Sequence, residues 1–139
     1  MNITYIDQPA LRLITVKAES CPAGIPASWQ SLETKRDTKG RKSYGVICGS
    51  PEGPVYYAGL FSDGEEEERT TGMPVLEVAG GPCARVKLMD WRQHIPEIAP
   101  LFAQLMEAVD QDTSRPNMEF YRSSTELHLL VPVKAKAKE

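Results

Sequence analysis

The segment Met118-Glu119-Phe120-Tyr121 places an acidic and a phenolic side chain two residues apart. In a β-strand, alternation puts Glu119 and Tyr121 on one face and Met118 and Phe120 on the other. If that face is open to solvent, Glu119 is an ordinary surface residue. If it is an inner face, the carboxylate is buried with no lysine or arginine in view, which is costly unless the charge is paired. A cationic ligand would supply the partner, and aromatic rings would add about 0.5–2 kcal/mol each through cation–π contacts.

Aromatic residues gather on the segments that we predict to be helices and strands. The chain has two tryptophans, five tyrosines and three phenylalanines. Those on or beside the predicted elements are Trp29, Tyr44, Tyr56, Tyr57, Trp91, Phe102, Phe120 and Tyr121. They would form the walls of a groove between two helices, or they would fill an ordinary core. Buried tyrosines also need a partner for the hydroxyl group.

The sequence contains no nucleophile-elbow, phosphate-loop or dinucleotide-binding motif. His94 precedes a predicted helix, where we expect a capping or surface role, and His128 lies on a predicted strand, where we expect it to face solvent. Cys21, Cys48 and Cys83 have no C-x-x-C spacing, and we interpret them as small buried hydrophobes or bystanders. We therefore expect no catalytic residue, no metal and no cofactor.

An internal repeat organises the chain, because the pair Ile25-Pro26 returns 70 positions later as Ile95-Pro96. Each pair predicts a helix start, since proline suits the first helical position. In the first helix, Trp29, Leu32 and the stem of Arg36 form a weak apolar stripe. The second helix has a clearer one, made of Ile95, Ile98, Phe102, Leu105 and Val109. Pro100 marks a place where that helix begins or bends.

Strand patterns flank both predicted helices in the same order. They cover residues 10–16, 43–48 and 55–61 around the first helix, and 83–88, 117–122 and 126–133 around the second. Lead-in strands are predicted at Tyr5 and at 75–78. Two such strand–helix–strand–strand repeats predict an α+β fold, with pseudo-twofold symmetry, one antiparallel sheet and two helices packed on it.

We expect a single domain, 1–139, with repeat one at about 1–61, a linker at 62–72, repeat two at about 73–133 and a tail at 134–139. The linker contains the acidic run 63–69, which is interpreted as a solvated loop or, alternatively, as an acidic interaction patch. The tail alternates lysine and alanine and is expected to be a frayed end.

Composition excludes several classes of protein. With 139 residues, a net charge of −3 and 41% hydrophobic residues, the chain is too acidic for a self-sufficient nucleic-acid binder and too apolar for a disordered protein. No segment is long and apolar enough to predict a membrane helix. The first residues lack a secretory signal, so the expected location is the cytoplasm.

The chain resembles the GyrI-like small-molecule-binding domain, which is also the effector-binding domain of AraC-type and MerR-type regulators. Four segments carry the resemblance: Tyr44-Gly45-Val46, Tyr57-Ala58-Gly59, Val78-Ala79-Gly80-Gly81, and Met118-Glu119-Phe120-Tyr121 followed by Leu130-Val131-Pro132-Val133. It covers essentially the whole chain. Met118 departs from the family pattern, which often has phenylalanine there, and a methionine makes a softer wall.

The resemblance implies an aromatic pocket between the repeats with a buried glutamate that attracts lipophilic cations. It implies Glu119 as that glutamate, with Tyr121 beside it and Tyr57 on a pocket strand. Trp91, Phe102 and Trp29 are candidate walls from their positions.

We expect a stand-alone sensor or sequestering protein for hydrophobic cationic molecules, similar to family members carried on mobile gene cassettes such as integron cassettes. No DNA-binding domain, nucleic-acid partner or membrane partner is expected, whereas a protein partner or a homodimer is left open. Two alternatives remain: a hydrolase that opens strained electrophilic natural products with Glu119 and Tyr121, and a protein-level inhibitor similar to the family's DNA gyrase inhibitor.

Overall fold

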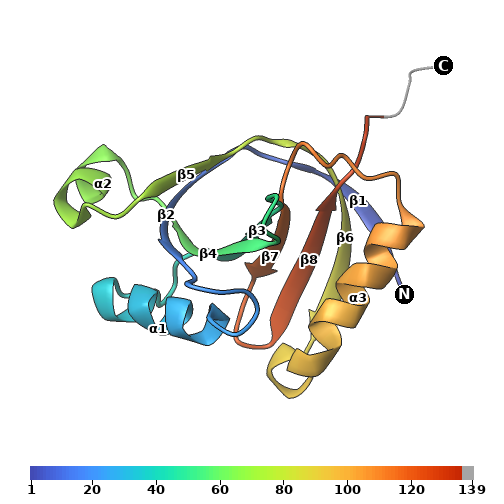
Figure 1. Cartoon of the computed structure of the whole chain (residues 1–139), viewed down its shortest axis with the longest axis horizontal. Helices are drawn as coiled ribbons and strands as arrows, with labels where there is room; N and C mark the ends of the chain where they lie inside the picture. The colour runs from blue at the N-terminus through green and yellow to red at the C-terminus, as the bar shows by residue number, and fades with distance from the viewer. Residues whose placement is uncertain (136–139) are drawn as a thin grey trace.

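The computed structural model describes residues 1–135, and these form one curled antiparallel sheet of eight strands with helices on its outer side (Figure 1). The strands of the first half are β1 (Thr4–Gln8), β2 (Leu11–Lys17), β3 (Ser43–Cys48) and β4 (Val55–Phe61). Those of the second half are β5 (Val75–Val78), β6 (Gly81–Met89), β7 (Asn117–Tyr121) and β8 (Glu126–Pro132). The predicted α+β architecture with one antiparallel sheet is confirmed.

The order of strands in the sheet is β1-β6-β8-β7-β3-β4-β2-β5. Strands β1 to β4 of the first repeat correspond, in order, to β5 to β8 of the second. When each strand is exchanged for its counterpart, the order reads the same from the opposite edge, so the sheet has the predicted pseudo-twofold arrangement. The symmetry lies between β3 and β7, where Gly45 pairs with Glu119.

The two lead-in strands are exchanged between the repeats. Near the N-terminus, β1 pairs with β6 of the second repeat, and β5 pairs with β2 of the first repeat. The sequence predicted both lead-in strands but not their pairing, which only the sheet topology shows. Each repeat therefore completes the sheet edge of the other, so the repeats are joined at both edges as well as at β3 and β7.

Both repeated helices begin at an Ile-Pro pair: α1 spans Ile25–Lys35 and α3 spans Ile95–Ala108. Pro100 lies inside α3 without ending it. A short 3₁₀ turn, η1 (Trp91–Gln93), precedes α3. No helix of the described residues has the length and apolar character needed to cross a membrane.

A third helix, α2 (Glu65–Thr71), occupies the segment that the sequence predicted as a solvated loop. That interpretation is wrong for Glu67, which is only 8% exposed. Its carboxylate accepts hydrogen bonds from Arg36 at 2.7 Å and from Arg41 at 2.7 Å. Arginines that lie 31 and 26 residues earlier in the chain thus pair the charge and bury it, which the local charge pattern does not show.

The core has a layer on each face of the sheet. On the outer face, one cluster lies under α3 around Phe102, Leu105 and Leu129, and another lies under α1 around Leu32 and Leu60. Inside the curl, a third cluster includes Leu13, Tyr44, Val46, Met118 and Leu130. Both faces of the central strands are therefore covered.

His128 shows the consequence of this two-sided burial. It lies on β8, between β6 and β7, and is 7% exposed, so the expectation that it faces solvent is wrong. Its imidazole pairs with Glu126 and packs edge-on against Phe120 at 5.5 Å. At the end of the chain, Lys134 Nζ lies 3.7 Å from Asp110, whereas residues 136–139 of the predicted tail lie outside the described residues.

Candidate functional site

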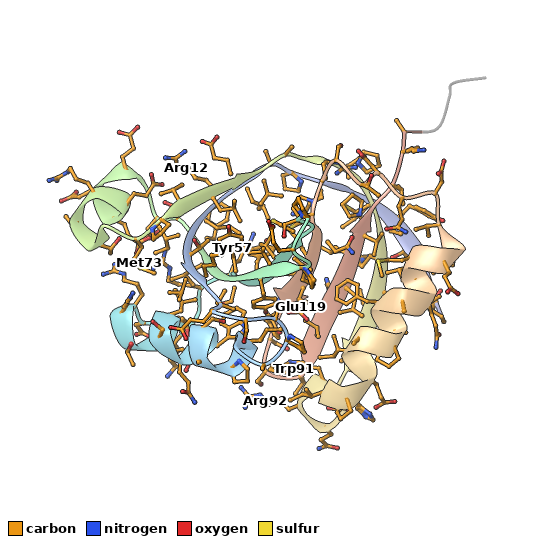
Figure 2. The ribbon with its side chains drawn as sticks, in the orientation of Figure 1. Arg12, Tyr57, Met73, Trp91, Arg92 and Glu119 are labelled. Carbon is orange, nitrogen blue, oxygen red and sulfur yellow. The ribbon has the colours of Figure 1, made fainter. Side chains whose placement is uncertain are left out.

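Glu119 lies at the centre of the sheet, on the outer face that carries α1 and α3. Alternation along β7 puts Asn117, Glu119 and Tyr121 on this face, as the sequence predicts. The residue is 7% exposed. Figure 2 shows it between the two helices, with Trp91 nearby. The buried alternative for Glu119 is therefore the correct one.

One oxygen of the Glu119 carboxylate collects hydrogen bonds from two phenols. The hydroxyl of Tyr56 donates to Oε1 at 2.7 Å, and the hydroxyl of Tyr121 donates to the same oxygen at 2.9 Å. The Tyr56 oxygen in turn accepts a hydrogen bond from Nε1 of Trp29 at 2.9 Å. Within residues 1–135, Oε2 of Glu119 accepts no hydrogen bond.

The two tryptophans flank Tyr121. Trp29 on α1 meets the Tyr121 ring edge-on with centroids 5.1 Å apart, and Trp91 on η1 does so at 5.0 Å. The Trp91 indole donates to the backbone oxygen of Ser123 at 3.1 Å, and the Arg92 guanidinium lies 5.3 Å from its ring centre. Side chains from both repeats thus form one aromatic group beside the carboxylate.

The electrostatic state of the site follows from burial. Glu119 forms no ion pair with any lysine, arginine or histidine of the described part of the chain. Desolvation raises the pKa of Glu119, and the hydrogen bonds from Tyr56 and Tyr121 oppose that rise. Burial, together with the negative charge of Glu119, raises the pKa of both tyrosines, so each phenol keeps its proton and acts as a donor.

Cys21 is an additional neighbour that the sequence did not assign to the site. Burial raises the pKa of its thiol, and the charge of Glu119 raises it further. The thiol is therefore protonated and weakly nucleophilic at neutral pH. Within residues 1–135, no group of three or more histidine, cysteine, aspartate or glutamate side chains is arranged to hold a metal ion.

Comparison with known proteins identifies the fold. No protein-family model matches the chain, and no curated protein matches its sequence. An integron cassette protein from the mobile metagenome of Vibrio cholerae has a similar structure, with a TM-score of 0.69, 15% identity and coverage of 96% of this chain and 95% of that one.

The protein SAV2435, solved bound to tetraphenylphosphonium, matches with a TM-score of 0.68, 16% identity and coverage of 97% and 95%. A putative transcription regulation protein of Staphylococcus aureus MU50 matches at 0.61, with 15% identity and coverage of 97% and 99%. Similarity at these identities establishes a shared fold over the whole domain. The GyrI-like resemblance remains a prediction.

The structure brings four of the six sequence-predicted site residues together: Glu119, Tyr121, Trp29 and Trp91. Phe102 belongs to the cluster under α3, against which Trp91 and Tyr121 also pack, and it contributes to the support of the site.

Tyr57 lies on the opposite face, inside the curl, as Figure 2 shows. Its neighbour Tyr56, which the sequence did not assign to the site, donates the hydrogen bond to Glu119. β3 pairs with β4 on one side and with β7 on the other, and this register puts Tyr56 and Glu119 on one face. Alternation along a single strand could not reveal this, because it does not specify how the strands are aligned.

Proposed function

We propose that this protein binds hydrophobic cationic small molecules at Glu119. The observation that carries the proposal is a carboxylate that is 7% exposed and is contacted by neutral donors alone. A buried charge of this kind is costly in free energy unless a counter-charge accompanies it. A cationic ligand would be that counter-charge.

The hydrogen bonds leave one oxygen for the ligand. Tyr56 and Tyr121 both donate to Oε1, so they fix the orientation of the carboxylate without occupying Oε2. Oε2 is therefore the atom that a cation would approach.

The aromatic group favours a hydrophobic cation over a hydrated one. When a ligand binds, the rings of Trp29, Trp91 and Tyr121 would give up contacts with one another and contact the ligand instead. A cation placed over an indole ring gains about 0.5–2 kcal/mol of binding free energy. Because Glu119 is nearly covered, one neighbouring ring must move for a ligand to reach it. Trp29 is the best candidate, because its indole is bonded to a side chain, Tyr56, whereas the Trp91 indole is bonded to the backbone oxygen of Ser123 and lies against Arg92.

The structural neighbours support the same class of ligand. SAV2435 was solved with tetraphenylphosphonium, a large apolar monocation. Because the fold is shared over 97% of this chain, we assign large apolar monocations to it as the class of ligand. An integron cassette protein and a putative transcription regulation protein among the neighbours favour a role as a sensor or sequestering protein.

The test compares tetraphenylphosphonium with tetraphenylborate, an anion of the same shape, by quenching of tryptophan fluorescence. We expect the wild type to bind the phosphonium and not the borate, and Glu119→Gln to lose at least tenfold in phosphonium affinity, equivalent to about 1.4 kcal/mol. Glu107→Gln, an exposed change on α3, is the matched control. At 100 times the dissociation constant, the phosphonium should also stabilise the wild type by about 2.7 kcal/mol.

Equal phosphonium binding by wild type and Glu119→Gln would overturn the proposal, as would no binding at all. In either case, the next assay would be turnover of strained electrophilic substrates, the alternative in which Glu119 acts as a general base.

A further inference from the structure

A cavity of about 320 Å³ lies at the end of the sheet where β3 ends and β7 begins, whereas the tryptophans contact Tyr121 at the other end of β7. Its walls come from residues 47–49, at the end of β3, and from residues 111–117, which connect α3 to β7. Segments more than 60 residues apart in the chain form it together. Neither the repeat nor the site described above accounts for this cavity.

The register connects the cavity to the carboxylate. Asn117, which lines the cavity, and Glu119 are alternate residues on β7, so their side chains leave the same face of the sheet. Two residues of antiparallel strand span about 7 Å. Ile47, another lining residue, pairs with Asn117 on one side and with Tyr56 on the other. Its side chain packs against the clusters under both α1 and α3, so it is an apolar neighbour of both the cavity and the strand that carries Tyr56.

The charged residues of the cavity already have partners. Arg115 Nε donates to Asp112 at 3.2 Å, and Arg115 Nη2 donates to the backbone oxygens of Pro82 and Val133 at 2.7 and 3.1 Å. The other Asp112 oxygen accepts a hydrogen bond from Ser114 N at 3.0 Å. The cavity thus offers no unpaired charge to a ligand.

Two of the residues that line this cavity carry side-chain amides. Gln111 Nε2 donates to the backbone oxygen of Met106 at 3.2 Å, and Asn117 Nδ2 donates to the Met106 sulfur at 3.2 Å. Within residues 1–135, neither amide oxygen accepts a hydrogen bond. An uncharged donor such as a hydroxyl or an amide N–H matches these two oxygens.

We propose that the ligand is bipartite: a hydrophobic cation at Glu119, with an arm that places an uncharged hydrogen-bond donor in the cavity beside Gln111 and Asn117. This inference rests on the proposed function, because it takes the cation at Glu119 as its starting point. The charge and the donor group are about 7 Å apart along β7.

Two phosphonium probes of equal length test it: hydroxypentyl-triphenylphosphonium, which ends in a donor, and hexyl-triphenylphosphonium, which ends in a methyl group. We expect the wild type to prefer the hydroxyl probe about fivefold, a typical gain for one hydrogen bond. Asn117→Leu and Gln111→Met should each reduce that preference. The readout is the ratio of the two affinities, so a folded variant that weakens both probes equally contradicts the role of that amide. The second variant serves if the first does not fold.

Equal wild-type affinity for both probes would overturn the inference and leave the cation site at Glu119 standing. If neither probe binds, both proposals fail.

Discussion

Gly45 lies directly opposite Glu119 in the pairing of β3 with β7, and the absence of its side chain makes room for the carboxylate. A Cβ atom at this position would overlap the Tyr56 hydroxyl and Oε1 of Glu119, and would lie 2.8 Å from Cζ of Tyr56. The two residues are therefore complementary. One repeat supplies the acid at the symmetry axis, and the other supplies the space for it.

Gly45→Ala should disrupt the hydrogen bond between Tyr56 and Glu119. The added methyl group meets a buried strand and two buried side chains, so we expect a loss of about 1–3 kcal/mol in the free energy of unfolding, measured by urea denaturation. Gly49→Ala is the matched control, because a Cβ atom there meets nothing within 4 Å. Equal stability of the two variants would show that the close approach at Gly45 is unimportant.

Tyr56→Phe should damage the site, whereas Tyr57→Phe on the neighbouring residue should not. The first change removes the donor to Glu119 and the acceptor for Trp29, so it leaves a partly buried indole N–H without its partner. We expect it to cost about 1–3 kcal/mol of stability and to weaken phosphonium binding. Tyr57 lies on the opposite face, so its variant should bind as the wild type does. Similar losses from both changes would contradict the assignment of Tyr56 to the site.

Cation affinity should rise with pH. Burial raises the pKa of Glu119, and a cation binds the ionised carboxylate, so binding below that pKa releases a proton. We expect affinity to rise about tenfold per pH unit below the pKa of Glu119 and to level off above it. Calorimetric titrations in buffers of different ionisation enthalpy would detect the released proton. Glu119→Gln should remove the dependence, and a dependence that persists in this variant would exclude Glu119 as its source.

The raised pKa of Glu119 also predicts how the stability of the protein without ligand changes with pH. The folded state holds the Glu119 proton to higher pH than the unfolded state, whose pKa is about 4.3. The free energy of unfolding should therefore fall as pH rises from that value to the folded pKa, and then stay constant. The fall amounts to about 1.4 kcal/mol for each unit between the two pKa values. The difference in stability between wild type and Glu119→Gln, followed by urea denaturation, should change over this range, and a constant difference would contradict the raised pKa.

Glu67 should make the opposite contribution. Hydrogen bonds from Arg41 first, and then from Asp63 N and Arg36, lower the pKa of Glu67 to about 2 against the cost of burial. Its stabilising effect is present above the unfolded pKa of about 4.3 and is lost as pH falls toward 2. We expect Glu67→Gln to cost about 1–3 kcal/mol at pH 7, because the two arginines lose a charged acceptor. The exposed change Glu66→Gln should cost much less, and equal costs would show that α2 does not depend on this pair.

The positions of the strands and of the two repeated helices could be predicted because their signals are local. Side-chain alternation marks β3 and β7, and the Ile-Pro pairs mark the starts of α1 and α3. The repetition of these signals was enough to predict one antiparallel sheet with pseudo-twofold symmetry. For the same reason, Glu119 and Tyr121 could be placed on one face before the surroundings of that face were known.

The tertiary structure decided which face is covered and which strands are neighbours. A period of two residues groups side chains by face, but burial depends on partners far away in the chain. His128 is buried because β6 and β7 enclose β8, and Glu67 is buried because Arg36 and Arg41 reach it. Tyr56, and not Tyr57, contacts Glu119 because the register, which no local pattern specifies, puts Tyr56 on the same face as Glu119 and one side-chain position along that face from it. The sequence by itself thus determined the strands, the two repeated helices and the acidic residue between them, whereas long-range pairing determined the contacts that this residue makes.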